Sequence, residues 1–190
     1  MNLPPDGSDR SPGPAPFRAA DVHLRPATHD DALCLSMLAL QVFLDTYAIE
    51  GIRPAIAREV AATYSERSFQ HAIAQPATRL SVAERAGHLI GFTQVTLGAT
   101  HALAPAGVQA ELLRLYVQER FTALGIGTRL LRESENIARS ADAAVMWLTP
   151  WSYNHRALAF YACRGYQDFG LTYFTFEGES HENRVCAKRL

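Results

Sequence analysis

The sequence lacks the features that mark several large classes of protein. Its three cysteines, Cys34, Cys163 and Cys186, lie far apart, so neither a disulfide framework nor a cysteine zinc site is indicated. The seven histidines show no ligand spacing, and we expect no metal. A net charge of -1 is not the basic excess of a dedicated nucleic-acid binder. No apolar run is long enough to cross a membrane. The cysteine usage fits a reducing compartment, so we expect a cytoplasmic protein.

What is present is enough apolar material for one domain. The chain has 190 residues, of which 48% are hydrophobic, and this suits a single folded unit with a substantial core. Residues 1–20 are rich in Pro, Gly, Ser and Asp and lack the apolar region of a signal peptide. We therefore expect a flexible tail over 1–20 and one domain over 21–190.

Hydrophobic periodicity predicts a mixed order of strands and helices. Strands are predicted over 21–25, 79–84, 88–97, 111–117, 143–149, 167–176 and 185–188, with a polar turn over 177–183. Helices are predicted over 28–40, 56–69 (with a short third one reaching 74), from the glycine pair Gly125 and Gly127 to Arg139, and over 154–164. This order predicts the α/β (α+β) class, with a mixed, mostly antiparallel sheet flanked by helices, and not a doubly wound sheet.

The run from Glu111 to Arg139 is the most informative stretch. A buried strand is followed by a loop with Gly125 and Gly127 and then by an amphipathic helix. Free amides at the start of a helix, next to glycines that permit close approach, make an anion site suited to phosphate. A turn that merely needs small residues explains the glycines equally well. Leu130 stands where a dinucleotide fingerprint needs its third glycine, and no phosphate-loop lysine follows.

Two motifs in this region resemble those of the GNAT superfamily of N-acetyltransferases, and the resemblance covers about 22–190. The superfamily motif Arg/Gln-x-x-Gly-x-Gly/Ala corresponds to Thr122-Ala123-Leu124-Gly125-Ile126-Gly127, with Thr in place of Arg or Gln. The motif Asn-x-x-Ala-x-x-Phe-Tyr-x-x-x-Gly-Phe/Tyr is matched in full by Asn154, Ala157, Phe160, Tyr161, Gly165 and Tyr166. The resemblance implies the acyl-CoA N-acyltransferase fold and acetyl-CoA as cosubstrate.

Within the superfamily, the chain is similar to the bacterial spermidine/spermine N-acetyltransferase branch. The similar segments are Phe43-x-Asp45-Thr46-Tyr47, Arg114-x-Tyr116, Trp147-x-x-x-Trp151-x-x-Asn154 and Asn183-Arg184-Val185-Cys186-Ala187-Lys188. The implied reaction is acetyl transfer to a primary amine, such as a polyamine, by direct attack in a ternary complex. A protein or amino-acid N-acetyltransferase and a non-catalytic acetyl-CoA-binding regulator remain alternatives. Exposed strand edges are compatible with a homodimer.

The resemblance also implies which residues bind acetyl-CoA. The cradle for its diphosphate would be formed by the backbone amides of Leu124, Gly125, Ile126, Gly127 and Thr128. The pantetheine arm would pair with the backbone of Leu115, Tyr116 and Val117, and Asn154 would fix it. The amide of Val117 would also face the thioester carbonyl and stabilise developing negative charge.

Two residues are candidates for proton transfer. Glu111 is the expected general base, directly or through a water, because an alkylamine is mostly protonated near pH 7. By the period-two rule it should share a face with Leu113, Leu115 and Val117, although a solvent-facing glutamate at a strand end is the alternative. By the same resemblance, Tyr161 is the expected acid for the leaving thiolate; the alternative is a half-buried aromatic. Asp45 and Glu50 are candidates for the acceptor wall, or surface charges.

Overall fold

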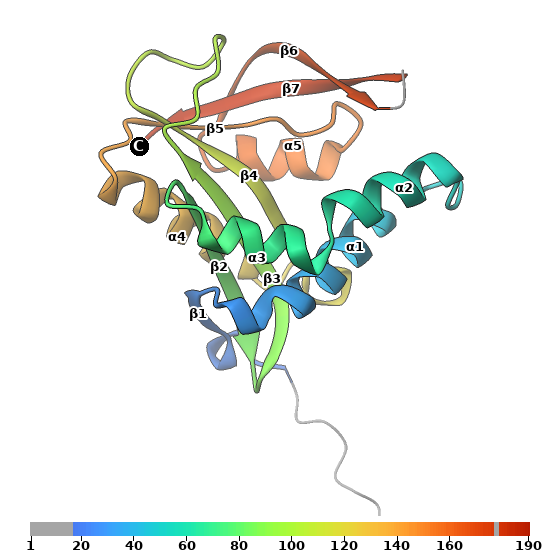
Figure 1. Ribbon diagram of the computed structural model, residues 1–190. Helices are drawn as coiled ribbons and strands as arrows, with labels where there is room; N and C mark the ends of the chain where they lie inside the picture. Colours follow the sequence, from blue (N-terminus) through green and yellow to red (C-terminus); the bar gives the residue numbers. More distant parts are fainter. Residues whose placement is uncertain (1–16, 177–178) are drawn as a thin grey trace, which may run out of the picture.

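Seven strands form one sheet in the computed structural model, which describes residues 17–176 and 179–190 (Figure 1). The strand order is β1-β2-β3-β4-β5-β7-β6. The strands are β1 His23–Pro26, β2 Thr78–Arg85, β3 His88–Leu97, β4 Gln109–Val117, β5 Val145–Leu148, β6 Gln167–Phe176 and β7 Glu179–Arg189. All neighbours pair antiparallel except β4 and β5, which are parallel. The predicted mixed, mostly antiparallel sheet is confirmed.

In the described part of the chain, five α-helices and three short 3-10 helices accompany the sheet. They are η1 Ala19–Asp21, η2 His29–Asp31, α1 Ala32–Tyr47, α2 Pro54–Thr63, α3 Glu66–Ala74, η3 Glu119–Phe121, α4 Ile126–Ser140 and α5 His155–Ala162. The single helix predicted over 56–69 is two helices, because Ser65 breaks it. The Ser65 hydroxyl accepts a hydrogen bond from the Ser68 amide at 3.2 Å and so caps α3.

The helices cover both faces of the sheet (Figure 1). On one face, Leu35 of α1 and Phe69 of α3 pack with Phe92 of β3. On the other face, α4 and α5 share a buried cluster with β4 and β5, which includes Leu131 and Leu112. The helices on each face therefore exclude water from one side of the central strands.

Two boundaries differ from the sequence prediction. The expected polar turn over 177–183 is mostly strand, because β7 continues to Glu179 and pairs Asn183 with Thr172 of β6; residues 177–178 lie outside the described part of the chain. The expected tail over 1–20 falls outside it up to residue 16. Phe17 already packs on Phe121, with ring centroids 5.4 Å apart. Among the residues described, no helix is long and apolar enough to span a membrane.

Candidate active site

Strands β4 and β5 separate after the first third of β4. Their pairing runs only from Gln109 to Glu111, whereas β4 stays paired with β3 as far as Val117. The Gln118 amide donates to the Ile90 carbonyl at 3.0 Å, which makes Gly91 and Val117 a non-hydrogen-bonded pair. The backbone N–H and C=O of Val117 therefore point into the gap that β5 leaves open.

The same alternation decides which other backbone groups face the gap. Leu115 lies opposite Thr93, and this pair is two residues along the ladder from the pair of Gly91 and Val117. The N–H and C=O of Leu115 therefore also point into the gap. Tyr116 lies between them and directs its N–H and C=O toward β3. Its side chain packs against the cluster formed with α1 and α3. Of the three residues predicted to pair with the pantetheine arm, Leu115 and Val117 have the required orientation and Tyr116 does not.

A β-bulge marks the point where the strands separate. Gln94 of β3 pairs with Arg114, but the next residue, Val95, pairs with Leu112. Leu113 is therefore an extra residue in β4, and its side chain is 44% exposed.

The bulge changes the face on which Glu111 lies. Glu111 is opposite Thr96, which is two residues from the partner of Arg114, so Glu111 and Arg114 share one face. Leu115 and Val117 pack on the other face, near α4. The prediction that Glu111 shares their face is wrong, because the period of two does not hold across an inserted residue.

The N-terminus of α4 lies near Leu115, since a Cβ on Gly127 would be 3.7 Å from the Leu115 side chain, and it carries amides without a backbone partner. Gly125 is the N-cap in the left-handed conformation, with φ 81°, and Ala123 before it has φ 59°. No backbone hydrogen bond in the described part of the chain uses the amides of residues 124–128. A Cβ on Gly125 would meet nothing within 4 Å, whereas one on Gly127 would lie 3.5 Å from Phe160. The residues thus fit a diphosphate, with Gly125 on the open side and Gly127 packed inward.

An arginine that the sequence analysis missed lies beside this turn. Arg164 donates from Nε and Nη2 to Oγ1 of Thr128, at 3.2 and 2.5 Å. Its guanidinium lies 3.7 Å from the centroid of the Phe160 ring. Thr122, which replaces the Arg or Gln of the motif, donates its hydroxyl to the Glu119 carbonyl at 2.8 Å. A positive charge is therefore present near the turn, but it comes from the end of α5.

The residues expected around the thioester are on α5. The Asn154 carboxamide oxygen caps the helix by accepting from the Ala157 amide at 3.0 Å, so its nitrogen is the atom that can donate to a ligand. Tyr161 is 8% exposed, and its ring lies 5.6 Å from that of Tyr166. Burial raises the pKa of Tyr161 well above its usual value, and the phenols of Tyr47 and the thiol of Cys186 add to the shift. The phenol is therefore protonated at neutral pH.

Glu111 is half-buried at the start of the gap, beside Trp147 of β5 in the parallel register. Burial raises the pKa of its carboxyl group above the ordinary value, and the charge of Arg114 opposes that shift. A carboxylate in this position is a better proton acceptor than a fully solvated one.

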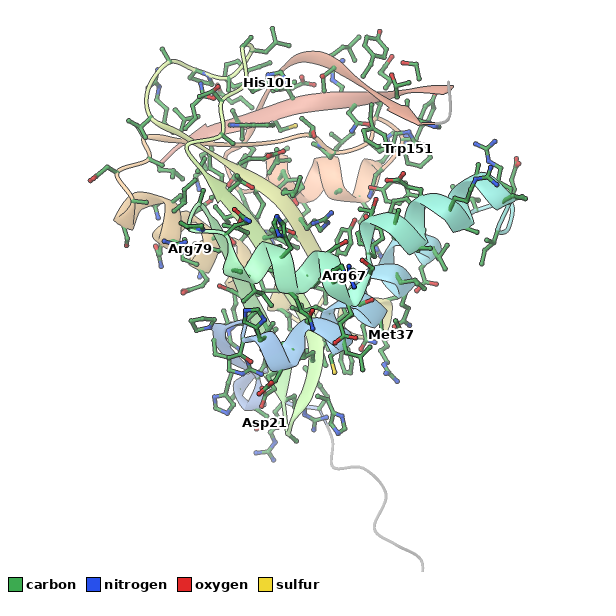
Figure 2. The ribbon with its side chains drawn as sticks, in the orientation of Figure 1. Asp21, Met37, Arg67, Arg79, His101 and Trp151 are labelled. Atoms are coloured by element: carbon green, nitrogen blue, oxygen red, sulfur yellow. The ribbon has the colours of Figure 1, made fainter. Side chains whose placement is uncertain are left out.

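A cleft of about 490 Å³ opens where α1, the end of β4 and the connection from β5 to α5 meet. Its lining residues are Val42, Asp45, Thr46, Ile49, Val117, Glu119, Trp151, Tyr153, Asn154, His155 and Arg156. Asp45 is among them, whereas Glu50 is not. Figure 2 shows Trp151 between the β6–β7 hairpin and α1, and its ring lies 5.6 Å from that of Tyr47.

An exposed ion pair that the sequence analysis did not find lines the cleft. Arg156 of α5 donates to both carboxylate oxygens of Glu119 in η3, at 2.7 and 2.8 Å. No group of three or more His, Cys, Asp or Glu residues within 17–176 and 179–190 could hold a metal ion.

Comparisons with known proteins agree with this geometry. The model of the acetyltransferase (GNAT) family matches residues 46–166. An uncharacterized N-acetyltransferase in the pepI 3' region of Lactobacillus delbrueckii subsp. lactis is 24% identical over 155 residues, which are 80% of this chain and 88% of that protein. The PaiA N-acetyltransferase of Thermoplasma acidophilum, solved with coenzyme A, has a TM-score of 0.73 at 22% identity over 89% of this chain and 99% of that one. The acetyltransferase YncA of Salmonella typhimurium, solved with acetyl-CoA, has a TM-score of 0.61 at 16% identity over 89% and 94%.

Proposed function

Since the chain belongs to the GNAT family of acetyltransferases, we propose that it transfers the acetyl group of acetyl-CoA to a primary amine by direct attack in a ternary complex. The observation that carries this proposal is the open edge of β4. Its unpaired N–H and C=O groups begin where β5 departs and run toward the free amides at the start of α4.

Acetyl-CoA supplies an acyl thioester, and the chain supplies the groups that hold it. The amides of residues 124–128 would bind the diphosphate, helped by the positive end of the α4 dipole. Leu115 and Val117 would pair with the amides of the pantetheine arm, and Asn154 would donate to it. The Val117 N–H faces the gap, where it can donate to an oxygen that gains negative charge, an effect typically worth about 3 kcal/mol.

Two side chains would move the protons. Glu111 would accept a proton from the incoming ammonium, directly or through one water, which gives the neutral amine needed for attack. Tyr161 would donate its phenolic proton to the departing thiolate. Burial supports the acid role, because a neutral phenol in a water-poor environment keeps its proton until a basic group forms beside it.

The finer proposal for the acceptor is a polyamine of the spermidine/spermine type. Asp45 supports it, because its carboxylate lines the cleft and makes no ion pair within the described residues, while Glu119 is already neutralised by Arg156. Trp151 and Tyr153 line the same cleft and would pack against the methylene segments between the nitrogens.

An acceptor screen tests the proposal. The purified protein is incubated with acetyl-CoA and a panel of polyamines, monoamines, amino acids and peptides, with free thiol and product mass as readouts. Thiol release with an N-acetylated polyamine is the expected result. Acetylation confined to peptides or amino acids would replace the polyamine, and coenzyme binding without product on any acceptor would refute the enzymatic function.

A further inference from the structure

Arg114 is held in a fixed position on the face of the sheet that carries Glu111. Its Nη1 donates to the side-chain carbonyl of Gln94, which is itself only 6% exposed. Its guanidinium lies 5.1 Å from the centroid of the Tyr64 ring and 6.0 Å from that of Phe69. Within the residues described, no carboxylate lies within ion-pair distance of it. Arg114 therefore brings a positive charge without a carboxylate partner to this face.

We propose that Arg114 is a positioning residue for acetyl transfer, whose tethered charge favours the ionised form of Glu111 without neutralising it in a contact ion pair. The inference rests on the proposed role of Glu111 as general base. Residues three apart in a regular strand would lie on opposite faces, and only the bulge at Leu113 brings these two charges to the same face.

The physical reason is a conflict that a half-buried base must resolve. Burial favours the protonated carboxyl group, which cannot accept a proton, so some positive charge nearby is required. An arginine in direct bidentate contact would overcorrect, because it would occupy the carboxylate oxygens and make them poor acceptors. Gln94 resolves the conflict by holding the guanidinium to itself, so that Arg114 acts on Glu111 through space.

The other groups around Glu111 do not supply this charge. Thr96 on β3 and Trp147 on β5 are its neutral neighbours in the sheet. His101, in the loop before β4, packs on Trp147 with ring centroids 5.0 Å apart. The phenols of Tyr47, Tyr64 and Tyr116 lie on the α1 and α3 side, and a phenol carries no positive charge. Arg114 is the charged residue of the described chain to which the pKa of Glu111 responds.

The test compares Arg114→Met with Arg114→Lys. In Arg114→Met, the Glu111 carboxyl pKa, followed by NMR of side-chain 13C-labelled glutamate and assigned with Glu111→Gln, should rise. The acidic limb of the pH profile of kcat/KM should move upward by the same amount. Arg114→Lys should restore most of both shifts. Arg79→Met is the matched control, because Arg79 is exposed on neighbouring β2, and should change neither (Figure 2).

The outcomes separate this inference from the proposed function. An unchanged Glu111 carboxyl pKa in Arg114→Met overturns it, as does a shifted carboxyl pKa without a shift of the acidic limb. If Arg114→Met fails to fold, Gln94→Leu releases the guanidinium instead and should also change both readouts. If Glu111→Gln keeps the rate and the acidic limb of the wild type, then Glu111 is not the base and the proposed mechanism itself fails, whatever the carboxyl pKa does.

Discussion

Replacing Tyr161 with phenylalanine removes only the phenolic oxygen and so tests the contribution of that one atom to the proposed mechanism. The ring of Tyr161 packs between Phe160 and Tyr166, with centroids 5.1 and 5.6 Å away, and phenylalanine keeps these contacts. We expect kcat to fall by about 10² to 10⁴, the usual contribution of a general acid. The Kd of acetyl-CoA, measured by calorimetry, should change by less than about threefold, because the proposed contacts to the phosphates and the arm are made by other residues.

The pH profile adds a second test of the same residue. Burial raises the pKa of Tyr161, so its proton is bound throughout an ordinary assay range. The wild-type rate should therefore rise with pH as Glu111 ionises and should not fall again by about pH 9 through loss of the phenolic proton. Tyr166→Phe is the control, since Tyr166 donates to Glu135 Oε1 at 3.3 Å in the same cluster, away from the gap. It should lose about 1 kcal/mol of stability and keep kcat. A Tyr161→Phe enzyme with wild-type kcat would refute the acid role.

Three further predictions concern the cofactor turn, the acceptor and folding. Gly125→Ala should weaken acetyl-CoA binding more than Gly127→Ala does, because Gly125 has a φ of 81° that alanine rarely adopts, although the space around it is open. At Gly127 the added Cβ would make only ordinary contacts. Titration calorimetry compares the two affinities, and equal values would contradict the role of the turn in binding the diphosphate. Asp45→Asn should raise KM for spermidine several-fold with kcat nearly kept, and an unchanged KM would remove Asp45 from the acceptor wall. Asp31, whose pKa is lowered to about 2 chiefly by its hydrogen bond from Arg25, contributes stability that is complete above about pH 5 and lost as the pH falls toward 2. Asp31→Asn should therefore lower the free energy of unfolding, measured in urea at pH 7, by about 1–2 kcal/mol and make it less dependent on pH in the acid range. If the stability of the variant still falls steeply toward low pH, other groups cause that fall.

Much of the fold could be predicted because hydrophobic period and turn chemistry are local. The hairpin of β2 and β3 follows from two alternating segments around Ala86-Gly87, and both residues have the positive φ that a tight turn requires. The start of β7 could not be predicted, since its first residues are polar. They form strand only because β6 offers a long partner, which pairs Thr172 with Asn183.

In the candidate site, too, the residues of local motifs could be predicted, whereas contacts between distant segments could not. The glycine turn, Asn154 and Tyr161 each belong to a local motif, so the sequence could point to them; in the structure they belong to the N-terminus of α4, the N-cap of α5 and α5 itself. The ion pair of Arg156 with Glu119 and the hydrogen bond of Arg164 to Thr128 join residues more than thirty positions apart. No periodicity within one segment reports such contacts, because they depend on how α5 docks beside the start of α4.

The bulge at Leu113 shows how one inserted residue can determine the chemistry of a site. In an uninterrupted β4 the peptide groups facing β5 would continue from Ala110 and Leu112 to Arg114 and Tyr116. The extra residue shifts that phase, so the peptide groups of Leu115 and its second neighbour Val117 face the gap instead. The same shift leaves Glu111 on the face of α1 and α3, while Leu115 turns toward α4. The backbone groups of Leu115 and Val117 thereby point into the opening between β4 and β5, while the Glu111 side chain lies on the face of the sheet that carries α1 and α3. In the proposed mechanism, an amine that enters from the α1 side would reach Glu111 and a thioester in the gap at once, as direct transfer requires.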